Sequence, residues 1–119
     1  MSELRTDTDL IPTARQEGDA MLATVRGEID LHNSPELRGA LLDLLTRTSA
    51  KKVILNLAQV PYMDSSAIAV LVEMLQKLRR AGGKICLTNL QPRVKSLLEI
   101  ARLDSIFILV ATEEEALKK

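Results

Sequence analysis

Residues 53–72 read VILNLAQVPYMDSSAIAVLV and join an apolar strand pattern to the start of a long helical pattern. The nearly continuous apolar run over residues 53–57 is typical of a central strand that is buried on both faces of a sheet. The polar step Asp64-Ser65-Ser66 follows it, and the side-chain oxygens of Asp and Ser accept hydrogen bonds from the free N–H groups of a helix's first turn. The segment therefore predicts a buried strand followed by a helix over about residues 66–80.

Strand and helix patterns alternate on both sides of this segment. The sequence predicts strands over residues 11–16, 20–26, 51–57, 84–88 and 105–110, and helices that start near Ser34, Ser66, Pro92 and Thr112. This order predicts a single α/β domain with a mixed, mostly parallel sheet of about five strands and about four helices. Residues 1–10 are polar and unpatterned, so we expect a flexible lead-in there and the domain over residues 11–119.

The composition indicates one globular domain with an aliphatic core. The chain has 119 residues, of which 46% are hydrophobic, with only one Tyr and one Phe. Sixteen basic and sixteen acidic residues cancel, which leaves no electrostatic attraction to nucleic acid or to an anionic membrane surface. The sequence has no apolar leader and no apolar run of membrane-spanning length, and its single cysteine, Cys86, is interpreted as a buried apolar side chain. We expect a cytoplasmic protein that neither binds nucleic acid nor inserts into a membrane.

Residue counts argue against most enzymatic sites. One His and one Cys cannot build a Cys/His metal cluster. A Ser-His-acid triad would need His32, which follows a different predicted strand from Ser65 and is interpreted as a loop residue. The only glycine pair, Gly82-Gly83, follows a predicted helix and so does not form a phosphate-binding loop. We expect no catalytic residues, no metal and no cofactor.

The helix over residues 66–80 carries more apolar surface than packing on a sheet requires. One stripe is assigned to the core and comprises Ile68, Leu71, Val72, Leu75 and Leu78. A second stripe comprises Ala67, Val70 and Met74. The second stripe covers either a neighbouring helix or an exposed docking patch, and in the latter case its residues bind a partner.

Two short motifs stand at the carboxyl ends of strands, where α/β sheets commonly meet ligands and partners. They are Gly27-Glu28-Ile29-Asp30 and Tyr62-Met63-Asp64-Ser65-Ser66. Together they resemble the anti-sigma factor antagonist family, the stand-alone STAS domains, over about residues 13–117. The resemblance implies that a kinase phosphorylates Ser65, with Ser66 as the fallback acceptor. It also implies that Asp30 and Asp64 contact the partner.

The partners that this resemblance implies are an anti-sigma factor that is also a serine kinase of the histidine-kinase-like ATPase type, and a PP2C-type serine phosphatase. The chain departs from the family pattern at Ala67-Ile68-Ala69, where a Gly-Leu-Gly step is usual. Alanine raises helix propensity by about 1 kcal/mol per site over glycine, so the start of this helix should be firmer. The added methyl groups beside Ser65 are expected to hinder close approach of a kinase or phosphatase.

These features favour a phosphorylation-regulated anti-sigma factor antagonist without catalytic activity of its own. A rival hypothesis is a constitutive STAS subunit of a transport complex such as a lipid-transport ATPase, in which Ser65 is only part of a helix cap. A third is a receiver domain that accepts phosphate on Asp64. Against the third, no acidic pair ends the early strands and no lysine follows a late strand to hold metal and phosphate.

Overall fold

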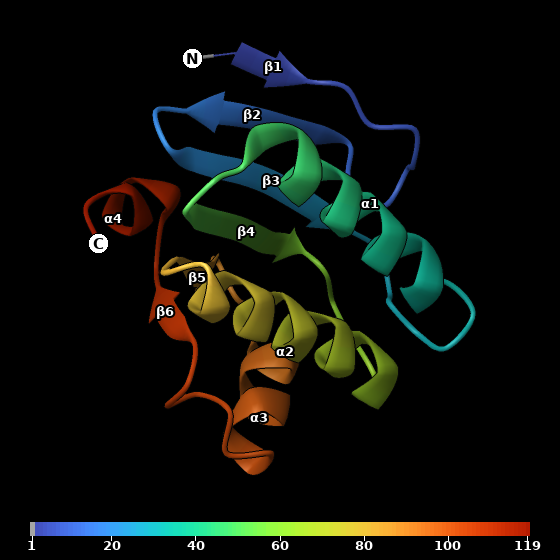
Figure 1. The fold of residues 1–119 in the computed structure, drawn as a ribbon. Coiled ribbons are helices and arrows are strands. Elements are labelled where there is room, and N and C mark those ends of the chain that lie inside the picture. The colour runs from blue at the N-terminus through green and yellow to red at the C-terminus, as the bar shows by residue number, and fades with distance from the viewer. Residues whose placement is uncertain (1) are drawn as a thin grey trace.

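The computed structural model describes residues 2–119, which form a six-stranded sheet in the order β1-β2-β3-β4-β5-β6 (Figure 1). The strands are β1 Ser2–Leu4, β2 Thr13–Glu17, β3 Ala20–Arg26, β4 Lys52–Gln59, β5 Lys84–Thr88 and β6 Ile108–Val110. β1, β2 and β3 pair antiparallel, whereas β3, β4, β5 and β6 pair parallel. The helices are α1 Ser34–Thr48, α2 Ser65–Arg80, α3 Pro92–Ile100 and α4 Glu113–Leu117. The predicted fold class is confirmed, with one strand more than expected.

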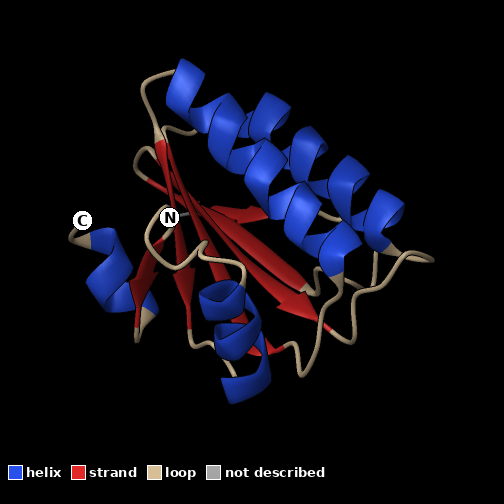
Figure 2. Ribbon diagram, turned by 90° about the horizontal axis from the view of Figure 1, so that it is seen from below, coloured by secondary structure: helices blue, strands red, loops and turns tan. Residues whose placement is uncertain are grey.

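The two faces of the sheet are covered unequally. Figure 2 shows α1 and α2 side by side over one face, while α4 lies on the opposite side. The main core packs the α1, α2 and α3 side chains against alternate residues of the central strands, among them Val53, Leu55 and Leu87. The residues between these, including Ile54 and Cys86, face a smaller cluster that Ala116 of α4 completes. Cys86 is fully buried there, as predicted, and burial raises the pKa of its thiol.

Residues 2–4, which were expected to belong to a flexible lead-in, instead form the first strand. Ser2–Leu4 pair antiparallel with β2 and form the edge of the sheet. The Arg26 backbone N–H also donates to the Leu10 carbonyl at 2.8 Å, which ties the following loop to β3. Edge pairing of this kind uses backbone groups, so a polar segment without an apolar pattern can still join the sheet.

The apolar arc of α2 is buried between the sheet and α1. Its buried residues are Ala67, Val70, Leu71, Met74, Leu75 and Leu78, whereas Ile68 and Val72 are only half-buried. Leu71, Leu75 and Leu78 of the predicted core stripe are buried as expected, and the second stripe is buried as well, in agreement with the alternative that a neighbouring helix covers it. Ala67, Val70 and Met74, predicted as candidate partner-binding residues, are 0%, 5% and 1% exposed and belong to the core. Their side chains are therefore not accessible to a partner.

The outer sides of α1 and α2 are joined by an ion pair. Arg38 of α1 donates to both carboxylate oxygens of Glu73 of α2 at 2.7 Å. The guanidinium lowers the pKa of Glu73, and the carboxylate raises the pKa of Arg38. This geometry explains why the wide arc of α2 needs no docking partner, since α1 covers it.

The end of α2 is held close to the start of β4. Gly83 N–H donates to the Leu78 carbonyl at 2.6 Å, and Lys84 N–H donates to the Lys51 carbonyl at 2.8 Å. A Cβ atom on Gly83 would lie 2.3 Å from the Lys51 carbonyl oxygen. Glycine is therefore required at this close approach. Within residues 2–119, none of the helices is both long enough and apolar enough to cross a membrane.

Candidate partner-binding site at the start of α2

Two loops meet at the carboxyl ends of β3 and β4. The Ile29 N–H donates to the Tyr62 carbonyl at 3.1 Å, and the Asp64 N–H donates to the Ile29 carbonyl at 3.0 Å. The side chains of Ile29 and Met63 are buried beneath these bonds. The loop that carries Asp30 is thus fixed against the loop that carries Asp64, as the shared edge of parallel strands predicts.

Asp64 is the N-cap of α2. Its Oδ1 atom accepts hydrogen bonds from the backbone N–H of Ser66 at 2.9 Å, the backbone N–H of Ala67 at 3.3 Å and the hydroxyl of Ser66 at 2.5 Å. The Ser66 hydroxyl and the backbone amides of Ala67, Ser66 and Leu31 hold the pKa of Asp64 below its ordinary value, although partial burial opposes this. A fixed negative charge therefore stands at the helix N-terminus, where the helix dipole favours it.

The two serines that follow Asp64 differ in their availability. Ser65 is the first residue of α2 and is exposed, and among the described residues its hydroxyl has no hydrogen-bond partner. Ser66 is half-buried, and its hydroxyl is committed to Asp64. The Ser65 hydroxyl is therefore accessible to an enzyme, whereas reaction at Ser66 would first have to break its hydroxyl bond to Asp64.

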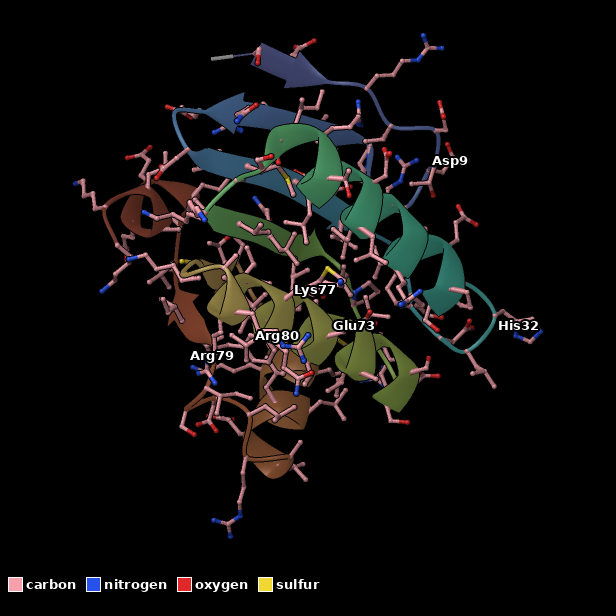
Figure 3. The ribbon with its side chains drawn as sticks, viewed as in Figure 1. Asp9, His32, Glu73, Lys77, Arg79 and Arg80 are labelled. Carbon is pink, nitrogen blue, oxygen red and sulfur yellow. The ribbon has the colours of Figure 1, made fainter. Side chains whose placement is uncertain are left out.

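A rigid turn stands beside this cap. Asp30 Oδ1 accepts hydrogen bonds from the backbone N–H groups of His32 at 2.9 Å and Asn33 at 3.3 Å, and Asn33 Oδ1 accepts from the Asp30 N–H at 2.8 Å. Leu31, at the tip of the turn, is 73% exposed. His32 is also exposed and points away from the domain, in keeping with its interpretation as a loop residue (Figure 3).

Leu31 was missed by the sequence reasoning. An aliphatic residue inside a turn of Asp, His and Asn was the available signal, because turn residues are usually polar and an exposed leucine is free to contact a partner. Within residues 2–119, it is one of two large hydrophobic side chains that are highly exposed, the other being Ile100 at 80%.

The sequence reasoning also missed a contact between the loop before α2 and the start of α3. The Arg93 guanidinium lies 4.8 Å from the centre of the Tyr62 ring, so the loop before α2 is held to the start of α3. A shallow groove of about 330 Å³ follows, lined by Tyr62, Pro92, Arg93, Ser96, Leu97 and Ile100. Only the fold brings the start of α3 next to Tyr62, which lies two residues before Asp64.

Comparison with known proteins identifies the fold. The STAS domain family matches residues 12–116 of this chain. This chain belongs to the STAS domain family. The anti-sigma-B factor antagonist of Bacillus subtilis (strain 168) is 30% identical to it over 100 residues, which cover 84% of this chain and 90% of that protein. The anti-sigma F factor antagonist of Paenibacillus polymyxa is 26% identical over 97 residues, which cover 82% of this chain and 83% of that protein.

Solved structures show the same STAS fold. The anti-sigma factor antagonist SpoIIAA in its unphosphorylated form has a TM-score of 0.75 and 23% identity, and the match covers 88% of this chain and 91% of that one. The phosphorylated form of SpoIIAA from Bacillus has a TM-score of 0.68 and 22% identity, and the match covers 88% and 95%.

The alanines that follow the serines occupy different environments in this STAS domain. The Ala67 methyl group is fully buried in the core, so it does not stand beside Ser65. Ala69 is exposed and lies four residues after Ser65, hence on the same side of the helix. The expected obstruction of a partner by two methyl groups is therefore reduced to the one at Ala69.

Proposed function

We propose that this STAS domain is a phosphorylation-regulated anti-sigma factor antagonist. Its unphosphorylated form binds an anti-sigma factor that is also a serine kinase of the histidine-kinase-like ATPase type and thereby releases that protein's client. Phosphorylation of Ser65 ends the binding, and a PP2C-type serine phosphatase restores it. The domain acts in the cytoplasm by binding alone. The observation that carries the proposal is the exposed Ser65 hydroxyl at the first position of α2, beside the capping carboxylate of Asp64.

The charges at the site support a switch that acts on binding. A phosphoserine adds about −1.5 to −2 charge at neutral pH. At Ser65 this charge would stand next to Asp64, which stays ionised because its pKa is lowered, and near the exposed Asp30. The start of a helix tolerates such charge within the free protein, but a partner would have to desolvate all of it at the interface. Affinity should therefore fall while the fold is retained.

Titration calorimetry with the kinase that copurifies from the native host tests the proposal. We expect Ser65→Asp to weaken binding by about 100-fold or more, corresponding to about 2.7 kcal/mol. Ser65→Ala should bind as wild type but accept no phosphate when incubated with the kinase and ATP. Ser105→Asp is the matched control, because it adds the same charge at an exposed serine before β6, away from the carboxyl ends of the strands. Equal affinity of Ser65→Asp and wild type for the kinase would refute the proposal.

Copurification from the native host also distinguishes the proposed function from its two rivals. A constitutive transport subunit would copurify with a transporter ATPase, and Ser65→Asp would leave that complex intact. For a receiver domain, Ser65→Ala would retain phosphate on Asp64. The involvement of the Asp64 carboxylate in capping α2 argues against the receiver hypothesis, since its Oδ1 atom already accepts three hydrogen bonds.

A further inference from the structure

A groove with an apolar floor and a basic rim lies between the C-terminal halves of α1 and α2. It has a volume of about 460 Å³. The aliphatic part of its lining is Leu42, Leu45, Ala50, Leu78 and Ala81, and the charged part is Lys51, Lys77 and Arg80. All three charged residues are exposed, and Lys77 and Arg80 lie on the C-terminal half of α2 with Arg79 (Figure 3). We call this feature the basic groove.

The positive charge of the basic groove is poorly neutralised within the chain. Among residues 2–119, no acidic side chain lines the groove, although the chain as a whole has a formal charge of zero. Glu73, one turn before Lys77, is held by Arg38 through two hydrogen bonds. In the part of the chain that the structure describes, Lys51 Nζ donates only to the Ala81 carbonyl, at 2.7 Å. The groove therefore fits an aliphatic side chain that is flanked by carboxylates.

The turn beside α2 presents such a side chain. Leu31 is 73% exposed and is preceded by the exposed carboxylates of Glu28 and Asp30. The hydrogen bonds between Asp30 and Asn33, and from Asn33 Nδ2 to the Glu28 carbonyl at 2.9 Å, hold this turn rigid. Little conformational entropy would be lost on docking it.

The turn cannot reach the groove of its own chain. It precedes the first residue of α1, whereas the groove is lined by the C-terminal half of that helix. α1 has 15 residues, which span about 22 Å. Any contact between the two features must therefore form between molecules.

We propose that a second copy of this chain inserts Leu31 into the basic groove, with Glu28 and Asp30 facing Lys51, Lys77 and Arg80. The copies then associate head to tail, because each molecule offers the turn at one end and the groove at the other. One anchoring side chain with a few exposed ion pairs predicts weak association, with a Kd of about 10 μM to 1 mM that rises with salt. The turn adjoins Asp64, so under the proposed function self-association and kinase binding compete; the association itself does not depend on that function.

Sedimentation velocity tests the association directly. We expect the wild-type protein to sediment faster as its concentration rises to about 1 mM at low salt, and to revert to monomer at about 0.5 M salt. Leu31→Lys removes the anchor, and Lys77→Glu with Arg80→Glu reverses the rim, so each variant should remain monomeric. Ile100→Lys is the matched control, because it changes the other highly exposed hydrophobic residue and should associate as wild type. Circular dichroism verifies that each variant is folded.

Mixing the two monomeric variants gives the sharpest outcome. The Leu31→Lys protein keeps an intact groove, and the rim variant keeps an intact turn, so a head-to-tail contact predicts a 1:1 heterodimer that does not grow further. A mixture that stays monomeric, or a wild type that is monomeric at the highest concentration, would overturn the proposal. Binding of a monomeric wild type to phosphatidylglycerol vesicles would overturn it too and would assign the groove to an anionic membrane surface. If the wild type self-associates as predicted but its Ser65→Asp variant binds the kinase as tightly as the wild type, the proposed function alone is contradicted.

Discussion

Ser65 and Ser66 are adjacent in the sequence but have opposite roles at the start of α2. The Ser66 hydroxyl helps to fix the Asp64 carboxylate, at 2.5 Å from its Oδ1 atom, while Ser65 remains exposed. A phosphate on Ser65 therefore adds charge without dismantling the cap. This division supports the proposal that the first serine is the acceptor, a distinction that the sequence motif alone does not contain.

Removing the carboxylate of Asp64 should produce a pH-dependent loss of stability. The folded-state pKa of Asp64 lies below its ordinary value, so its ionised form stabilises the fold above the ordinary Asp pKa of about 3.9. This contribution is lost as the pH falls through the lower folded-state pKa. We expect Asp64→Asn to be less stable than wild type at pH 7, and the difference in the free energy of unfolding to shrink below about pH 4. Urea titrations across this range check it, and a difference that grows on acidification would contradict the capping role.

The Ser66 hydroxyl should be the main cause of that low pKa. Its hydrogen bond favours the charged form of Asp64 more than any single backbone amide does. We expect Ser66→Ala to raise the pKa of Asp64, measured from the carboxyl carbon shift by NMR. Ser65→Ala is the matched control and should leave that pKa unchanged.

Alanine substitutions at two glycines, Gly83 and Gly39, should have opposite effects on stability. Alanine at Gly83 would place its Cβ 2.3 Å from the Lys51 carbonyl oxygen, whereas alanine at Gly39, inside α1, would meet nothing within 4 Å. We expect Gly83→Ala to lower the free energy of unfolding by about 1–3 kcal/mol through overpacking. Gly39→Ala should raise it by about 0.5–1 kcal/mol. Chemical denaturation of both variants checks the contrast, and equal effects would contradict the geometry at Gly83.

At the scale of elements, α2 is both the carrier of the site and a core helix. Most of its wide apolar arc packs against the sheet and α1 and contributes stability, and the candidate site lies at the helix start. The sequence could predict the length of this helix because its cap and its terminal glycines are local signals. It could not decide whether the second stripe is covered by a helix or exposed, since that depends on where α1 lies.

A substitution of Met74 tests whether this side chain belongs to the core. Its side chain is 1% exposed between the sheet and the helices, so Met74→Ala should lower the free energy of unfolding by about 2–5 kcal/mol. Ile100→Ala is the surface control and should change it by less than about 0.5 kcal/mol. A Met74→Ala protein with wild-type stability but weakened kinase binding would instead return this residue to the partner surface.

At the scale of the whole molecule, the sheet brings the site together from segments distant in sequence. The proximity of Asp30 and Asp64-Ser65 could be predicted because parallel strands end at one edge. The exposure of Leu31 and the contact of Tyr62 with Arg93 could not be predicted, because they depend on the conformations of the loops. The pairing of β1 was equally invisible, because its polar residues join the sheet through backbone groups alone.

The fold should tolerate a negative charge at Ser65 without unfolding. The site rests on loops that are bonded to each other, and the core beneath them is independent of Ser65. We expect Ser65→Asp to change the free energy of unfolding by less than about 1 kcal/mol, because attraction to the helix dipole offsets repulsion from Asp64. Thermal unfolding followed by circular dichroism measures this, and a change of several kcal/mol would mean that lost binding reflects lost structure.

The central claim is that Ser65 is the phosphorylated switch of this STAS domain. Phosphosite mapping by mass spectrometry, on protein purified from its native host in growing and in stressed cells, tests it most directly. We predict phosphate on Ser65, with an occupancy that differs between the two conditions. Phosphate confined to another residue, or a Ser65 that is unmodified in both conditions, would contradict the account.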